Sequence, residues 1–85
     1  MDQNEYYWGV VLETLSDTGY STEELHEIFK FKFLQDKIKH HSIIKSTSQL
    51  DTKEMEEYLE NIRRFASLEL GISIPLPNEP PLPNL

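Results

Sequence analysis

The stretch LDTKEMEEYLENIRRFASLELGI, residues 50–72, decides the fold, because it carries both ends and the repeating apolar pattern of an amphipathic helix. Asp51 is placed to cap the first turn, and Glu54, three residues later, completes a capping box. Gly71 is placed to end the helix in the left-handed conformation. Between these ends apolar side chains recur every three or four positions, which predicts one apolar face. That face consists of Met55, Tyr58, Leu59, Ile62, Phe65, Ala66 and Leu70.

Working outward, a second helix is predicted over residues 2–18. Asp2 has the side chain of an N-cap, and Gly19 is suited to end the helix. At 100° per residue, one stripe of this helix is apolar, and we expect it to pack against the helix of residues 50–72. We also expect Trp8 to be the largest single burial in the domain. The stripe consists of Tyr7, Trp8, Val11, Leu12 and Leu15.

A third helix is predicted between these two. Ser21 and Glu24 form its capping box, and we expect it to end near Leu34. Phe31 and Leu34 point away from its main apolar face, so they form spare apolar surface for the C-terminal tail, a second copy of the chain or a protein partner. The main face consists of Leu25, Ile28, Phe29 and Phe33.

The remaining segments lack a helical pattern. Residues 35–49 are predicted to form a loop with a short extended piece or small hairpin. All five prolines lie in residues 75–85, so this tail is expected to be extended or disordered. The predicted fold is therefore a mainly α, three-helix domain over residues 1–74, followed by the Pro-rich tail.

Composition excludes several classes of protein. A chain of 85 residues forms one domain at most. There is no run of about 18 apolar residues, which argues against a membrane span, and no pattern typical of a signal peptide. The absence of cysteine excludes disulfides and thiolate metal sites and fits the cytoplasm. We expect no cofactor, no metal site and no enzymatic activity, because no catalytic arrangement of side chains can be recognised.

Charge is unevenly distributed along the chain. Residues 30–45 hold five lysines and one aspartate, a net +4, whereas the rest holds three basic and fourteen acidic residues, a net −11. Lysines with neighbouring hydroxyl groups are typical contacts to phosphates. The alternative is a solvated loop whose lysines offset the acidic helices. The candidate nucleic-acid contacts are Lys30, Lys32, Lys37, Lys39, His40, His41, Lys45, Ser46, Thr47 and Ser48.

The polar face of the helix at residues 50–72 offers a second candidate surface. It carries Glu56, Glu57 and Glu60, which suit a basic partner protein. The alternative is an ordinary solvent-facing side of a helix.

The order of residues resembles the NinB (Orf) family of phage recombination proteins. The opening DQN with YW close behind, residues 2–8, resembles the family's "DQN…W" element. Residues 19–34, GYSTEELHEIFKFKFL, look like its central helix, and residues 45–58 are similar to its "ST(S/T)" strand end and following helix. Residues 62–75 fit its C-terminal end. The resemblance covers nearly the whole chain, but the family's N-terminal β-rich region has no counterpart before Asp2.

The resemblance implies a non-enzymatic, phage-encoded accessory protein of DNA recombination, acting in the cytoplasm of the bacterial host. Members bind single-stranded and partly duplex DNA and act with single-strand-binding protein, so single-stranded DNA or a DNA-bound host protein is the expected partner. The alternative is a small acidic phage inhibitor or adaptor that binds a basic host protein, such as a nuclease of an RNA-guided defence system. A homodimer through Phe31 and Leu34 also stays open.

Overall fold

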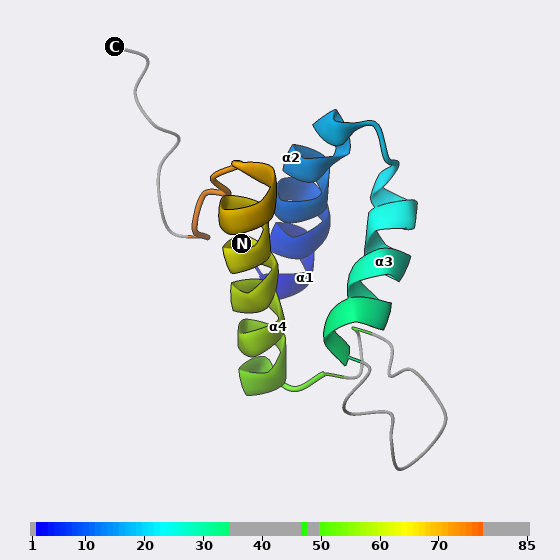
Figure 1. The fold of residues 1–85 in the computed structure, drawn as a ribbon. Coiled ribbons are helices and arrows are strands. Elements are labelled where there is room, and N and C mark those ends of the chain that lie inside the picture. Colours follow the sequence, from blue (N-terminus) through cyan, green and yellow to red (C-terminus); the bar gives the residue numbers. More distant parts are fainter. Residues whose placement is uncertain (1, 35–46, 48–49, 78–85) are drawn as a thin grey trace.

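The computed structural model describes residues 2–34, 47 and 50–77, and these residues form three helical segments around one core (Figure 1). No strand occurs in these ranges. The mainly α, three-helix prediction is therefore confirmed. The predicted loop or hairpin falls almost wholly on residues 35–46 and 48–49, which lie outside the described residues, as do residues 78–85 of the Pro-rich tail.

The first helical segment runs without a break from Gln3 to Thr18, but its winding changes. It comprises α1 (Gln3–Tyr6), the π-helix η1 (Tyr7–Leu12), α2 (Glu13–Leu15) and the 3₁₀-helix η2 (Ser16–Thr18). The Asp2 carboxylate accepts a hydrogen bond of 2.8 Å from the backbone N–H of Glu5, and Gly19 ends the segment at φ +107°. Both predicted ends are confirmed.

The second segment is α3 (Thr22–Leu34), and the capping box predicted for it is present. The Ser21 hydroxyl accepts from the backbone N–H of Glu24 at 3.1 Å, and the Glu24 carboxylate accepts from the backbone N–H of Ser21 at 3.0 Å. Because these hydrogen bonds with the backbone and side chain of Ser21 favour the ionised form, the pKa of Glu24 lies below its ordinary value.

The third segment is α4 (Thr52–Phe65), which continues as the π-helix η5 (Ala66–Leu70). Asp51 and Glu54 form the predicted capping box, with hydrogen bonds of 2.7 and 3.0 Å. At the other end Gly71 adopts φ +65°, and the backbone N–H of Ile72 donates to the carbonyl of Ala66 at 3.0 Å. This closing bond is typical of a glycine-ended helix.

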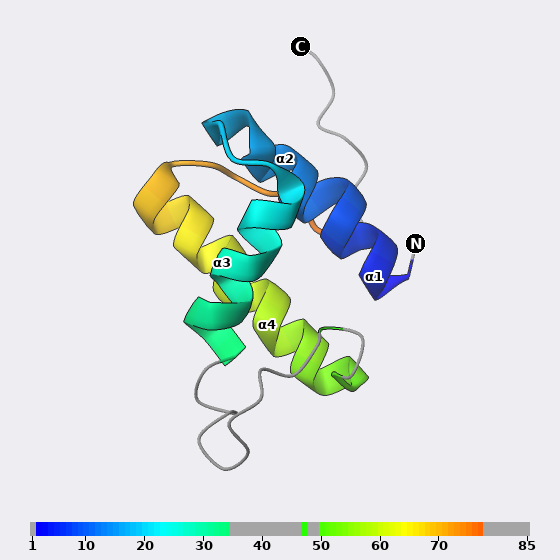
Figure 2. The same cartoon turned by 90° about the vertical axis from the view of Figure 1, so that its right-hand side faces the viewer.

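The three segments pack so that α3 contacts each of the others. Figure 1 shows α4 and the segment of α1 and α2 side by side, with α3 beside them, and Figure 2 shows α3 crossing α4 and beginning next to α2. Contacts join α3 to η1, α2 and α4. The buried cluster between them consists of Tyr6, Tyr7, Val11, Leu12, Leu15, Leu25, Phe29, Leu34, Met55, Tyr58, Leu59, Ile62, Ala66 and Ile74.

Aromatic residues fill this core, but Trp8 is not its main member. Tyr6, Tyr7 and Tyr58 are at most 1% exposed, whereas Trp8 is only partly buried. Its ring centroid lies 4.6 Å from that of His26, at the rim of the core. The prediction that Trp8 is the largest burial is therefore wrong. The interior is instead filled by the neighbouring Tyr6 and Tyr7.

The outward and inward residues of α3 also differ from the prediction. Ile28, assigned to the buried face, is 43% exposed, and Leu34, assigned to the spare outer surface, is 2% exposed. At 100° per residue, Leu34 lies about 180° from Leu25, so the buried arc covers roughly half of the helix circumference. This arc is wide because three other elements contact α3. Leu34 is therefore removed from the candidate docking surface.

The chain beyond Gly71 crosses back over the core. Ile74 is 7% exposed, and the hydroxyl of Tyr6 donates to the carbonyl of Pro75 at 2.6 Å. This hydrogen bond holds the start of the Pro-rich tail against α1. Within the described part of the chain, no helix has the length and apolar character needed to cross a membrane.

Candidate nucleic-acid interface

The outer side of α3 carries an exposed patch of Glu27, Ile28, Phe31 and Lys32, here called the α3 patch. Phe31 is 60% exposed and Ile28 43%. The four side chains line a shallow hollow of about 610 Å³. Because Glu27 and Phe31, like Ile28 and Lys32, are four positions apart, each pair lies side by side on the helix surface. The patch therefore presents an aromatic ring and an aliphatic side chain between two charges.

Lys32 is held at one edge of this patch by two aromatic rings. Its Nζ lies 4.9 Å from the ring centroid of Phe65 and 5.7 Å from that of Phe33. Such cation–π contacts orient the ammonium group without neutralising it. No ion pair joins Lys32 to another described residue, and its side chain is exposed. As far as the described residues extend, its charge is therefore open to an anionic ligand.

Two of the residues predicted to contact nucleic acid do not lie open to a ligand. Nζ of Lys30 is 3.1 Å from a carboxylate oxygen of Glu27, and the Lys30 side chain is only 16% exposed. Thr47 is 7% exposed, and its carbonyl accepts from the backbone N–H of Leu50 at 3.2 Å. Seven further predicted contacts lie outside the described residues: Lys37, Lys39, His40, His41, Lys45, Ser46 and Ser48.

The acidic face of α4 is tied to the protein's own Arg63. Nη2 of Arg63 lies 2.9 Å from Glu60 and 3.5 Å from Glu56, while Nη1 donates to the hydroxyl of Tyr6 at 3.1 Å. Burial opposes the charge of Arg63, but the hydrogen bonds to Glu60 and Tyr6 outweigh it and raise its pKa. Three glutamates were predicted to bind a protein. Among the described residues, only Glu57 of these three is exposed and makes no ion pair with Arg63.

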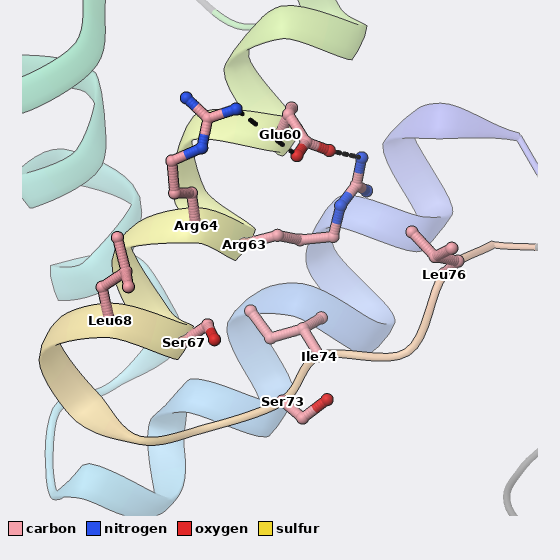
Figure 3. A pocket seen from close by; sticks show the side chains of 8 residues that line it. All are labelled: Glu60, Arg63, Arg64, Ser67, Leu68, Ser73, Ile74 and Leu76. Carbon is pink, nitrogen blue, oxygen red and sulfur yellow. Dashed lines mark hydrogen bonds and ion pairs between the residues drawn. The ribbon is translucent and has the colours of Figure 1, made fainter.

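A second hollow of about 610 Å³ lies between the end of α4 and the chain at residues 73–76 (Figure 3). Arg64 is its most exposed charge, with a side chain 64% exposed and 3.9 Å from Glu60. Both signs of charge line this hollow, so it has no clear preference for an anion or a cation. Its lining residues are Glu60, Arg63, Arg64, Ser67, Leu68, Ser73, Ile74 and Leu76.

A buried chain of hydrogen bonds joins the three helical segments. The hydroxyl of Tyr7 lies 2.8 Å from the hydroxyl of Tyr58 and 2.8 Å from Nδ1 of His26. Burial raises the pKa of both tyrosines, and for Tyr7 the neighbouring Tyr58 adds to the effect. These hydrogen bonds were not predicted from the sequence, because Tyr7 and Tyr58 were placed only on apolar helix faces and no role was assigned to His26.

The rest of the described surface gives no sign of a metal centre. Within residues 2–34, 47 and 50–77, no three His, Asp or Glu side chains are grouped so that they can hold a metal ion.

No known family model matches this chain, and neither a curated protein nor a solved structure shows significant similarity to it.

Proposed function

We propose that this chain is a non-enzymatic accessory protein that holds single-stranded nucleic acid against the α3 patch and the lysine-rich segment that follows it. The observation that carries the proposal is the 60% exposed ring of Phe31 beside the exposed ammonium of Lys32. An open aromatic face stacks on any base, and an adjacent cation attracts the phosphate that follows it. Single strands are favoured because only an unpaired base exposes its face.

The charge distribution supports one limited contact rather than a broad one. The described residues hold thirteen acidic and five basic side chains, so the helical body repels phosphates over most of its surface. Lys32 stands at the end of α3, and in the sequence it is followed by Lys37, Lys39 and Lys45. Nucleic acid is therefore expected to bind at this end of α3, with an affinity that depends strongly on salt.

The resemblance to the NinB (Orf) family agrees with this proposal and extends it. It suggests a phage-encoded protein of DNA recombination that works in the host cytoplasm beside single-strand-binding protein. The proposal about α3 does not depend on that resemblance, because it rests on Phe31 and Lys32.

Fluorescence anisotropy with a labelled oligo-dT strand of about 20 nucleotides in 20 mM salt tests the stacking contact. Stacking on one base is worth about 1–3 kcal/mol, so Phe31→Ala is expected to weaken binding by about 5- to 150-fold. Leu68→Ala is the matched control, because Leu68 is 74% exposed and lies on η5, outside the α3 patch. Equal affinities for the two variants contradict a stacking role of Phe31.

A matched pair of lysine variants tests the phosphate contact. Lys32→Gln and Lys53→Gln change the net charge equally, but only Lys32 lies in the α3 patch. Lys32→Gln is expected to reduce the slope of log affinity against log salt by about 0.7, as expected for one phosphate contact of a single strand. Lys53→Gln leaves the slope unchanged. If the wild-type chain does not bind the oligo-dT strand even in low salt, the proposed function is wrong.

A second candidate function is an acidic adaptor or inhibitor that binds a basic host protein. The observation that favours it is the thirteen-to-five excess of acidic over basic side chains, together with the internal use of Arg63. Glu57 is the better contact on α4, because Glu56 and Glu60 hold Arg63.

This second candidate is tested by capture from a nuclease-treated lysate of the cells in which the protein is made. A partner bound through acidic groups is expected to be lost with a Glu57→Lys bait and retained with a Phe31→Ala bait. The reverse pattern favours the α3 patch instead. Reversing Glu56 or Glu60 is less informative, because it places like charge beside Arg63.

A further inference from the structure

The buried polar chain joins one residue from each helical segment: Tyr7 from η1, His26 from α3 and Tyr58 from α4. Tyr7 is 0% and Tyr58 1% exposed, so neither hydroxyl reaches water readily. Two hydrogen bonds link these residues, one between the hydroxyls of Tyr58 and Tyr7 and one between the hydroxyl of Tyr7 and Nδ1 of His26, each with a heavy-atom distance of 2.8 Å. Each of the two hydrogen bonds holds one hydrogen atom.

When His26 is neutral, both hydrogen bonds can form and no hydroxyl hydrogen is left without an acceptor. With its proton on Nε2, the imidazole accepts at Nδ1 from the hydroxyl of Tyr7, which in turn accepts from the hydroxyl of Tyr58. Every hydroxyl hydrogen of the chain is then bonded. No side-chain nitrogen or oxygen that is buried in the described residues lacks a partner, in agreement with this arrangement.

When His26 is protonated, three hydrogens, on Nδ1 of His26 and on the two tyrosine hydroxyls, compete for the same two hydrogen bonds. An imidazolium carries hydrogen on Nδ1, so Tyr7 must accept from His26 and turn its own hydrogen toward Tyr58. The hydrogen of Tyr58 is then displaced, and the only partner of its hydroxyl among the described residues is Tyr7. A buried donor without an acceptor is destabilising.

We propose that Tyr58, Tyr7 and His26 form a pH-sensitive latch that holds η1, α3 and α4 together while His26 is neutral and loosens when His26 gains a proton. The latch is independent of the proposed nucleic-acid function, because its three residues lie outside the α3 patch. Glu27 of that patch affects the latch only through its charge, which acts on His26.

The groups around His26 support this direction. From its own helix, Lys30 and Glu27 act on it with opposite charges, and η1 contributes the uncharged rings of Tyr7 and Trp8. Burial and then Lys30 lower the pKa of His26, and Glu27 acts against them. The unfolded chain therefore binds the proton better, so stability is complete above the ordinary pKa of about 6.5 and decreases as the pH falls below it.

Trp8 provides a reporter for the latch. It is the single tryptophan of the chain, and its ring centroid lies 4.6 Å from that of His26. A charge that appears on the imidazole acts directly on the indole ring, which is the best cation–π partner among the side chains. Tryptophan fluorescence therefore follows the protonation of His26 in the folded chain.

The test compares the melting temperature and the Trp8 fluorescence of the whole chain at pH 7.5 and 5.5, at constant ionic strength. His26→Asn is the reference variant, because its amide oxygen takes the place of Nδ1 as an acceptor but does not titrate. The melting temperature of the wild type is expected to fall further than that of His26→Asn between the two pH values. The fluorescence of the wild type is expected to titrate, whereas that of the variant stays constant.

Tyr7→Phe separates the latch from simple burial of a histidine. This variant breaks the hydrogen bonds between Tyr58, Tyr7 and His26 but leaves His26 buried beside Lys30. Its melting temperature is therefore expected to be lower at pH 7.5, and to fall less than that of the wild type on acidification. A Tyr7→Phe variant as sensitive to pH as the wild type overturns the proposal. If His26→Asn does not fold, long-range ¹H–¹⁵N NMR of the wild type at pH 7.5 decides: the Nε2–H tautomer supports the latch, and the Nδ1–H tautomer overturns it.

Discussion

The helices α3 and α4 begin alike and differ in what they leave exposed. Both start with a complete capping box. On α4 the large apolar side chains turn inward, and two of the outward glutamates bind Arg63. On α3, Ile28 and Phe31 turn outward while the stem of Lys30 is covered. The polar face of α4 thus contributes to stability, whereas the outer face of α3 contributes little and is the better place to look for a ligand.

Replacement of Phe29 by alanine is expected to give the largest effect on stability. Phe29 lies on the inner face of α3 at 1% exposure, and its ring meets those of Phe33 and Phe65 at centroid distances of 6.0 Å. Truncating a buried phenylalanine costs about 3–5 kcal/mol of the free energy of unfolding. Urea unfolding followed by circular dichroism measures it, and a loss below about 1 kcal/mol contradicts the packing described for α3.

Arg63→Met tests whether the polar face of α4 contributes to stability. Methionine keeps an apolar stem but removes the hydrogen bonds to Tyr6 and Glu60, so the expected loss is about 1–2 kcal/mol. Arg64→Met is the matched control, because Arg64 is 64% exposed and lies 3.9 Å from Glu60. Its expected effect is within about 0.5 kcal/mol. Equal losses in the two variants mean that the contacts of Arg63 add nothing specific.

Removing the N-cap side chains tests whether α3 and α4 are stabilised equally at their first turns. Asp51→Ala and Ser21→Ala each remove one side-chain acceptor from the first turn of a helix. Each is expected to lower the free energy of unfolding by about 1 kcal/mol. Thermal unfolding of both variants measures the loss of stability. If only one of the two variants is destabilised, the two capping boxes do not contribute alike.

The same comparison shows which parts of the fold can be predicted from the sequence. The caps at Asp2, Ser21 and Asp51 were predictable because each depends on residues three positions apart. The faces of α4 were predictable because its apolar and charged residues separate cleanly. The prediction was wrong for Leu70, which was assigned to the same apolar face but is 41% exposed on η5. The faces of α3 were not predictable, because apolar residues occur on both sides and only the contacting elements decide that Leu34 is covered and Ile28 is not.

The candidate site divides in the same way. Lys32 was predicted from the run of lysines in the sequence, whereas Phe31 was predicted as exposed apolar surface. The roles of Arg63 and His26 were not, because their partners Tyr6, Tyr7 and Tyr58 come together only in the packed structure. Such long-range hydrogen bonds leave no periodic signal along the chain.

Phe31→Ala is expected to have the smallest effect on stability and the largest on binding. Phe31 and Phe29 are the same residue type, two positions apart on one helix, but Phe31 is 60% exposed and Phe29 1%. Removing an exposed side chain changes the free energy of unfolding by no more than about 0.5 kcal/mol. Urea unfolding and oligo-dT binding, measured on the same sample, therefore separate the two roles. If Phe31→Ala instead unfolds as readily as Phe29→Ala, its ring belongs to the core and the α3 patch is not a binding surface.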